Sequence, residues 1–279
     1  MPRASLLSMS RQPRAKAFRG PRPMAHCLIG LGSNLGDRPD HLRRAMLALA
    51  RLPATRLLAR SRFHETAPLG GPAGQGRFLN AAAVAETSLE PVRWAARPLD
   101  LDLLLYGRQV VETPSLAAPH PRMTYRRFVL QPAVEIAAGM LHAESQWTVG
   151  RLLNHLDAAR DAVAVAARDG RDAAALVEGL AERFGLGVRP AAAATSRPTL
   201  CRWEGERGAA SFAVGSGRPK LLLAVRSSAG ISFRHLRTML HLPPHGPIGW
   251  IGCDAAIDPL DEACAAIESV WPELTRKPS

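Results

Sequence analysis

Cysteine is scarce in this 279-residue chain, and its four copies do not form pairs. Cys27, Cys201, Cys253 and Cys264 are scattered with no CxxC spacing. This pattern argues against a disulfide framework and against a zinc site built from thiolates. We expect reduced thiols that are buried or half buried.

Long apolar runs are missing as well. No stretch of about eighteen uncharged apolar residues occurs, and the most apolar segments, such as 101–106 and 221–225, have the length of a strand. This excludes a membrane-spanning helix and predicts a soluble, cytoplasmic protein. The length permits two domains, and an apolar content of 47% is enough for at least one real core.

Acidic residues are absent from residues 1–24, where six arginines and lysines supply half of the formal charge of +12. Elsewhere arginine is spread along the chain rather than gathered in a stripe with aromatics, which argues against nucleic-acid binding. We expect residues 1–23 to be a basic disordered extension before Met24. An organelle transit peptide is the alternative, but four prolines would interrupt its helix.

The glycine fingerprints of common phosphate loops are missing too. Gly30, Gly32 and Gly36 miss the GxGxxG spacing by one residue, and no Gly-Lys-Ser or Gly-Lys-Thr follows. The sequence therefore predicts neither a Rossmann site nor a Walker loop. Taken alone, these glycines predict a tight strand-to-helix turn.

Periodicity predicts alternating strands and helices in the first half of the chain, typical of an α+β or α/β layered fold. Strands are expected over 25–32, 55–66, 79–89 and 99–107, and helices over 38–52, 124–140 (broken near Pro132) and 148–163. A glycine- and proline-rich loop over 68–78 is a candidate substrate cover.

Asp100 and Asp102 are the first candidates for chemistry. On a strand, residues two apart point to the same face, so both carboxylates can hold a hard cation such as magnesium. Two solvated acids on an edge strand are the alternative. Nearby cations favour a phosphate site, because Arg97 precedes the pair and His120, Arg122 and Arg126 follow it.

These signals belong to an ordered series of motifs. The series comprises residues 31–37 (LGSNLGD), 65–70 (ETAPLG), 78–80 (FLN), 93–94 (RW), 97–102 (RPLDLD) and 119–122 (PHPR), with Arg126 and Phe128 beyond it. The series resembles that of the 6-hydroxymethyl-7,8-dihydropterin pyrophosphokinase family, over residues 24–157. The resemblance implies a ferredoxin-like layered fold with a mainly antiparallel sheet and helices. It also implies transfer of a pyrophosphoryl group from ATP to the pterin alcohol, in folate biosynthesis.

The resemblance also implies roles for single residues. Asp100 and Asp102 would bind two magnesium ions, and Arg97, His120 and Arg126 would contact the phosphates of ATP. Phe78 and Phe128 would enclose the pterin ring, with Thr66, Leu69 and Asn80 at its polar edge and Trp94 as a further substrate contact. Ordinary structural roles, such as core aromatics for Phe78 and Phe128, are the alternatives for these positions.

One stretch of the family pattern is missing. Only Val92 stands between Pro91 and Arg93, so about twenty residues are absent, enough for a helix and a turn. The resemblance implies that this piece normally forms much of the lid over ATP. Two compensations are conceivable: residues 158–279 cover the exposed face, or Arg62, Arg77 and Arg127 replace the lost charge.

Residues 158–279 are expected to form a small α+β module of unknown function, with a linker over 190–198 and a last helix near 261–271. Two functions stay open. The first is an active pterin diphosphokinase with ATP as co-substrate. The second is a pterin-binding or scaffold protein that has lost the ATP lid and assists a neighbouring folate-pathway enzyme.

Overall fold

The computed structural model describes residues 23–69, 74–91, 100–113, 115–188, 198–203, 218–226, 231–252, 257–274 and 276. Several expectations lie outside these residues. They are the extension over 1–22, the predicted contacts of Trp94 and Arg97, and all of the 190–198 linker except its last residue.

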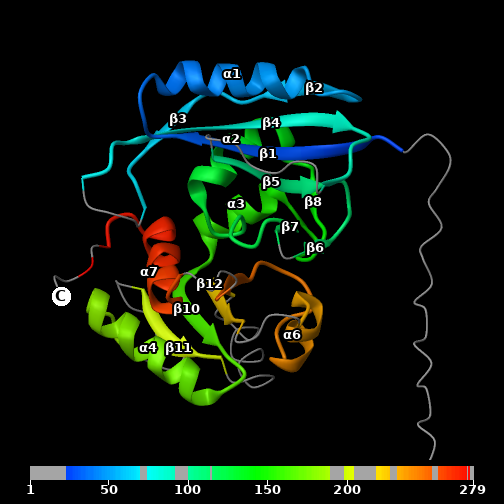
Figure 1. Cartoon of the computed structure of the whole chain (residues 1–279). Helices are drawn as coiled ribbons and strands as arrows, with labels where there is room; N and C mark the ends of the chain where they lie inside the picture. The colour runs from blue at the N-terminus through cyan, green and yellow to red at the C-terminus, as the bar shows by residue number, and fades with distance from the viewer. Residues whose placement is uncertain are drawn as a thin grey trace, which may run out of the picture.

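An antiparallel sheet forms the framework of the first half of the chain (Figure 1). Its strands are β1 (Ala25–Ser33), β2 (Thr55–Arg60), β3 (His64–Thr66), β4 (Phe78–Thr87) and β5 (Asp100–Tyr106). The strand order is β2-β4-β1-β5, and β3 pairs with the beginning of β4. Helix α1 (Arg38–Ala50) covers one face, whereas α2 (Arg127–Ala137) covers the other and packs against α3 (Val149–Ala158). Two hairpins complete this half, β6 (Val111–Thr113) with β7 (Leu116–Ala118) and β8 (Leu141–His142) with β9 (Trp147–Thr148).

Helix α1 follows the predicted pattern. Asp37 caps it by accepting a hydrogen bond from the Asp40 backbone N–H at 3.0 Å, a cap typically worth about 1 kcal/mol. Gly36 forms the preceding turn with a φ of 57°, which glycine adopts without steric cost. Gly30 and Gly32 lie inside β1, within the strand expected over 25–32, so of the three glycines only Gly36 serves the turn.

Helix α2 is continuous, although a break was expected near Pro132. Proline inside a helix costs about 3 kcal/mol because it removes a hydrogen bond and crowds the preceding turn. Here Val129, Leu130 and Ala133 are buried on the same helix, with exposed fractions of 8% or less. Burial of large apolar side chains contributes roughly 1.5–3 kcal/mol each, enough to offset the proline.

The second half of the chain is built on a parallel sheet, so it is of the α/β type rather than the expected α+β type. Its strands are β10 (Arg160–Ala166), β11 (Thr199–Arg202), β12 (Pro219–Val225) and β13 (Gly249–Ile251), in the order β11-β10-β12-β13. Its helices are α4 (Gly170–Phe184), α6 (Phe233–Met239) and α7 (Pro259–Val270). Parallel strands need crossover connections, and here α4 lies between β10 and β11 and α6 between β12 and β13.

Residues 160–163 were predicted to continue a helix, but they form the beginning of strand β10. Val163 and Val165 lie in the core cluster beside α7, whereas Ala164 and Ala166 lie in the cluster beside α6. This alternation between two cores is the two-residue period of a strand.

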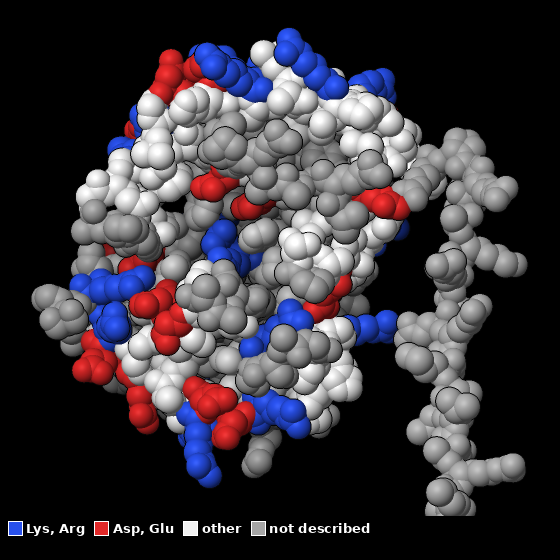
Figure 2. Space-filling model, viewed as in Figure 1, with Lys and Arg blue, Asp and Glu red and all other residues white. Residues whose placement is uncertain are grey.

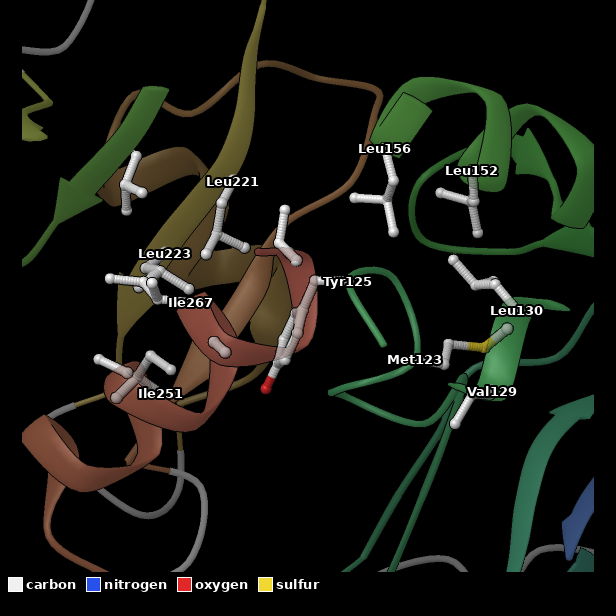
Figure 3. Packing of buried hydrophobic residues seen from close by; sticks show 14 of the residues in the cluster. Met123, Tyr125, Val129, Leu130, Leu152, Leu156, Leu221, Leu223, Ile251 and Ile267 are labelled. Atoms are coloured by element: carbon white, nitrogen blue, oxygen red, sulfur yellow. The ribbon is translucent and has the colours of Figure 1, made fainter. Parts of the chain in front are cut away.

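The two halves share one hydrophobic core. A single cluster joins buried residues of β1, β4, β5 and α2 to residues of β10, β12, α4 and α7. Figure 3 shows Met123 and Tyr125, which precede α2, between the two groups of side chains. The domain boundary at 157/158 stays a prediction, and it falls at the end of α3.

No helix in the part of the chain that the structure describes combines the length and apolar character needed to cross a membrane. Cys27, Cys201 and Cys264 are buried free thiols, as expected for three of the four cysteines.

Buried His142 makes the fold sensitive to acid. It is 3% exposed, its Nδ1 accepts a hydrogen bond from the Ser145 N–H at 3.2 Å, and burial lowers its pKa from 6.5 to about 3. Between these values the unfolded state binds the extra proton, so stability is fully present above pH 6.5 and falls as the pH drops toward 3. We expect a loss of about 1.4 kcal/mol per pH unit from this histidine.

Denaturant unfolding from pH 7.5 to 4.5 measures this effect. His142→Asn keeps an acceptor near Nδ1 but cannot take up a proton in this range. We therefore expect its free energy of unfolding to fall less steeply than that of the wild type. Parallel curves for the two proteins would show that His142 is not responsible.

Candidate functional site

The candidate site lies where one face of the antiparallel sheet extends beyond the core. Along β5, Leu104 is fully buried, Asp102 is partly exposed and Asp100 is exposed. Alternate residues of a strand point to the same face, so the two carboxylates continue the row that Leu104 occupies in the core. The predicted polar start and buried end of this strand are confirmed.

Two glycines of the central strand leave room beside these carboxylates. Gly30 is paired with Asp102, and Gly32 is paired with both Asp100 and Asn80. A Cβ atom on Gly32 would lie 3.3 Å from Asn80 Oδ1 and 3.8 Å from Asp100 Cβ. Larger side chains would therefore fill the space between the carboxylates and the Asn80 amide.

A cavity of about 330 Å³ opens above these strands. Nine of the residues predicted from the sequence line it: Thr66, Leu69, Phe78, Asn80, Asp100, Asp102, His120, Arg126 and Phe128. Arg122, which the sequence indicated as a nearby cation, also lines it. The other lining residues were not predicted: Gly30, Leu31, Gly32, Ala67, Ala81 and Val129. The alternation of Gly30 and Gly32 on one strand face is the signal that would have identified the two glycines.

One wall of the cavity carries a buried amide and a hydroxyl. Asn80 is 5% exposed, and its Nδ2 donates a hydrogen bond to Thr66 Oγ1 at 2.9 Å. This bond orients the amide, with Asn80 Oδ1 near Gly32 on the cavity floor. The pair can recognise a ligand that carries polar groups at its edge.

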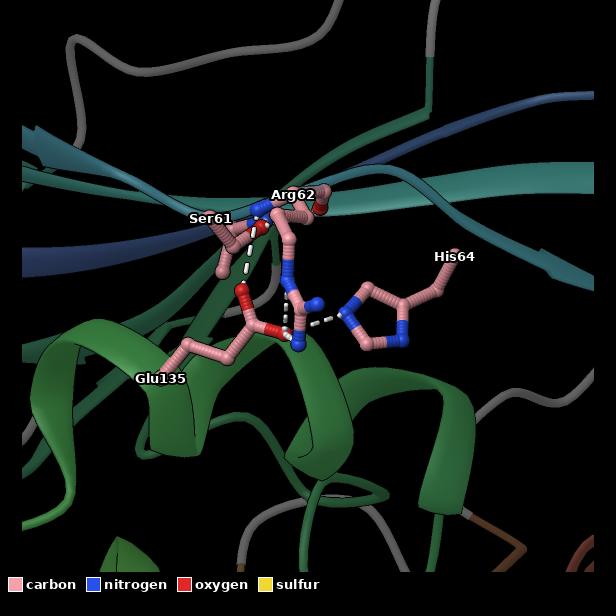
Figure 4. A network of polar contacts seen from close by, with 5 residues as sticks. Ser61, Arg62, His64 and Glu135 are labelled. Carbon is pink, nitrogen blue, oxygen red and sulfur yellow. Dashed lines mark hydrogen bonds and ion pairs between the residues drawn. The ribbon is translucent and has the colours of Figure 1, made fainter.

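The segment before Thr66 is fixed on α2 by Glu135, as Figure 4 shows. The Glu135 carboxylate accepts hydrogen bonds from the Arg62 backbone N–H, the Arg62 guanidinium and the His64 ring, each at 2.9 Å. The backbone bond from Arg62, followed by its guanidinium, lowers the pKa of Glu135 to about 2. Thr66 thus stands two residues beyond a point anchored to the helix.

The opposite wall carries His120. Its backbone N–H donates to Leu104 O at 2.9 Å, which places the ring near Asp102, with His120 Nε2 3.9 Å from Asp102 Oδ2. His120 Nδ1 accepts a hydrogen bond from the Arg122 N–H at 3.1 Å. Burial, with nearby arginines, lowers the pKa of His120 to about 3, so the ring is neutral and carries its proton on Nε2. His120 is therefore a neutral donor at the site.

Arg126 brings a positive charge to the same wall. It is the N-cap residue of α2, and its guanidinium lies over the Phe128 ring, 5.5 Å from the centroid. Burial raises the pKa of Asp102, and the charges of Arg126 and Arg122 partly oppose this shift. The helix N-terminus and the arginine together favour an anionic ligand.

The donor set fits magnesium that is shared with a phosphate ligand. Among the described residues there is no cluster of three or more His, Cys, Asp or Glu side chains that could hold a metal alone. Magnesium usually binds one or two carboxylates and takes its other ligands from water and phosphate oxygens. Asp100 and Asp102 meet this requirement, because both line a cavity that also holds the cationic wall.

The three arginines proposed to replace the charge of the missing lid are each paired with a carboxylate. Arg62 is paired with Glu135, Arg77 with Glu65 at 2.9 Å, and Arg127 with Asp157 at 2.5 Å. None of them is among the described residues that line the cavity. Their nearness in sequence to the motifs did not reveal the direction of their side chains.

Charges on the molecular surface are mixed. On the face shown in Figure 2, basic and acidic side chains alternate among the described residues instead of forming a basic stripe. The absence of nucleic-acid binding stays a prediction from the sequence.

A family comparison identifies the first half of the chain. The sequence model described as 7,8-dihydro-6-hydroxymethylpterin-pyrophosphokinase (HPPK) matches residues 28–93 and 90–138. The two matched segments meet at residues 90–93, where the sequence indicates a missing stretch.

Individual relatives agree with this match. The 2-amino-4-hydroxy-6-hydroxymethyldihydropteridine pyrophosphokinase of Pseudomonas aeruginosa is 39% identical over 128 residues, which cover 39% of this chain and 78% of that protein. The enzyme of the same name from Haemophilus influenzae is 36% identical over 142 residues, which cover 44% of this chain and 88% of that protein. The mitochondrial folate synthesis bifunctional protein of Arabidopsis thaliana is 36% identical over 130 residues, which cover 39% of this chain and 23% of that protein.

A solved structure of Plasmodium falciparum HPPK-DHPS with pteroate aligns with a TM-score of 0.39 and 10% identity, covering 75% of this chain and 64% of that one. The relationship to the bacterial enzymes rests instead on sequence, since the matched region covers more than two thirds of each of them. This chain therefore belongs to the 7,8-dihydro-6-hydroxymethylpterin-pyrophosphokinase family.

Proposed function

We propose that this protein transfers a pyrophosphoryl group from ATP to 6-hydroxymethyl-7,8-dihydropterin, giving the pterin diphosphate and AMP in folate biosynthesis. The observation that carries the proposal is the convergence of four chemistries in one cavity. Carboxylates, cations, two aromatic rings and an amide–hydroxyl pair line the same space of about 330 Å³. The relatives that share this region are named for the same reaction.

The pterin binds between the aromatic and polar walls. Phe78 and Phe128 both line the cavity, and aromatic side chains suit a flat heteroaromatic ring. The Asn80–Thr66 pair hydrogen-bonds its polar edge, with Leu69 beside it. A pterin without these edge groups would leave the buried Asn80 amide unsatisfied, which costs about 1–3 kcal/mol.

The phosphates of ATP bind at the cationic wall. His120 Nε2–H and the guanidinium groups of Arg126 and Arg122 serve as donors, and Arg97 and Trp94 complete the site in our proposal. Asp100 and Asp102 hold two magnesium ions, which neutralise charge on the phosphate oxygens when bound.

The transfer requires alignment rather than a covalent intermediate. The hydroxymethyl oxygen of the pterin attacks the β-phosphorus of ATP and forms an O–P bond, and its proton passes to solvent water. The bond from the β-phosphorus to the oxygen shared with the α-phosphate breaks, and its electron pair leaves with AMP. The rigid cavity walls hold the two substrates in line, and the fixed donors stabilise negative charge on the phosphates.

We extend the proposal to the layout of the domains, the cellular compartment and a partner. The strand order β2-β4-β1-β5 supports a ferredoxin-like layout for residues 24–157, with residues 158–279 as a second domain. The protein works in the cytoplasm. A neighbouring folate-pathway enzyme is a candidate partner, because a plant relative is named as a bifunctional folate synthesis protein.

Purified full-length protein incubated with ATP, magnesium and the pterin tests the proposal. We expect AMP and pterin diphosphate to form in equal amounts, and AMP to depend on the pterin. Calorimetry of pterin binding accompanies the assay. Tight pterin binding without AMP would instead indicate the pterin-binding or scaffold protein that lacks turnover.

A further inference from the structure

The second half of the chain reaches the proposed site through one buried carboxylate. Glu262 lies in the first turn of α7 and is 4% exposed. Its Oε1 accepts a hydrogen bond from Arg122 Nε at 2.6 Å, and its Oε2 accepts one from the Gly252 N–H at 2.8 Å. Both oxygens are therefore engaged, and the carboxylate is held in one orientation.

Arg122 connects this contact to the proposed phosphate wall. Its side chain lines the candidate cavity and also a second cavity of about 470 Å³ beside α7. The two cavities share Leu69, Arg122, Arg126 and Phe128 as lining residues. Through its backbone N–H, Arg122 also fixes the His120 ring. Glu262 thus holds Arg122, whose side chain lines the candidate cavity and whose backbone N–H bonds the His120 ring.

Two further contacts fix the same segment from the second half of the chain. Thr124 Oγ1 donates a hydrogen bond to Ile248 O at 3.0 Å, and Ser269 Oγ of α7 donates one to Tyr125 O at 3.2 Å. The Tyr125 ring packs so closely on β13 that a Cβ atom on Gly249 would lie 2.9 Å from it. Figure 3 shows the Tyr125 ring against the ribbon of α7.

We propose that Glu262 is a positioning residue for pyrophosphoryl transfer, which orients Arg122 toward the phosphates of ATP and makes the second half of the chain part of the site. This inference rests on the proposed function. A buried carboxylate that engages Nε restricts the rotation of the guanidinium plane, and a planar guanidinium binds phosphate oxygens through directed hydrogen bonds. Residues outside the matched family region thereby complete the phosphate wall.

The variant Glu262→Gln removes the charge while keeping nearly the same shape. Its amide can accept only one of the two hydrogen bonds that the carboxylate accepts. We expect kcat/KM for ATP to fall roughly ten- to hundred-fold, with KM for the pterin changed less than about two-fold. Glu268→Gln is the matched control, because Glu268 lies on the same helix and also accepts a bond from an arginine Nε, that of Arg276, at 2.6 Å. We expect its kinetics to equal those of the wild type.

A double variant separates positioning from a purely structural ion pair. Arg122→Met with Glu262→Leu replaces the buried pair by apolar side chains, a change that often preserves stability. If Glu262 positions Arg122, we expect the double variant to unfold cooperatively near the wild-type temperature. Its turnover should nevertheless be as slow as that of the single variant Arg122→Met. Wild-type kcat/KM for ATP in the double variant or in Glu262→Gln would overturn the inference.

Binding of ATP with magnesium distinguishes failure of this inference from failure of the proposed function. If the wild type forms no pterin diphosphate, the proposed function fails, and calorimetry with ATP and magnesium tests Glu262 alone. An affinity at least ten-fold weaker in Glu262→Gln than in Glu268→Gln supports the positioning role. Equal affinities in these two variants overturn it.

Discussion

Asp100→Asn and Asp102→Asn are each expected to lower the turnover of pterin diphosphate formation at least about a thousand-fold. Asparagine keeps the shape of aspartate but loses the charge that binds a hard cation. Both carboxylates lie on the exposed end of β5, beyond the core. The substitutions should therefore leave the fold intact, so the loss appears in kcat and not in the thermal unfolding temperature.

Asp40→Asn is the control for these two variants. Asp40 is also partly exposed, and it forms an i,i+4 pair with Arg44 on α1, away from the cavity lining. Its removal should change turnover less than two-fold, because surface pairs contribute about 0–1 kcal/mol to stability. Full activity in Asp100→Asn or Asp102→Asn, with magnesium still required, would contradict the assignment of that residue.

Gly32→Val is expected to weaken pterin binding about a hundred-fold or more while the protein stays folded. The Cβ atom alone would lie 3.3 Å from Asn80 Oδ1, and the two methyl groups of valine add volume between Asn80 and Asp100. Valine suits a central strand, so the sheet tolerates it. Calorimetric titration with the pterin measures the change in affinity.

Gly170→Val is the matched control for this substitution. Gly170 begins α4, and a Cβ atom there would meet no heavy atom within 4 Å. We expect its pterin affinity to equal that of the wild type. Wild-type affinity in Gly32→Val would show that the pterin binds elsewhere and that the glycines of β1 serve only the fold.

Short-range patterns in the sequence were sufficient to predict much of the antiparallel half. The acids and leucines of β5 alternate with the two-residue period of a strand, and α1 repeats its apolar residues at three and four positions. The same period placed Asp100 and Asp102 on one face. The resemblance to a family then added Thr66, Asn80 and the two phenylalanines, which no local pattern separates from ordinary strand and core residues.

The second half was harder to predict because its strands are buried on both faces. The segment that forms β10 is almost wholly apolar after Asp161, so it gives no polar alternation, and it directly follows the helical pattern of α3. The contact of Arg122 with Glu262 joins residues 140 positions apart. No local spacing predicts such a pair, since only the packing of α7 against the first half brings the two side chains together.

The position of the bond that breaks in ATP tests the central claim most directly. ATP labelled in the β-phosphate is incubated with the protein, magnesium and 6-hydroxymethyl-7,8-dihydropterin, and the label is followed by chromatography. The account predicts that the label moves to the pterin as unlabelled AMP forms. Label that stays in ADP, or ATP that is not consumed, would contradict pyrophosphoryl transfer by this protein.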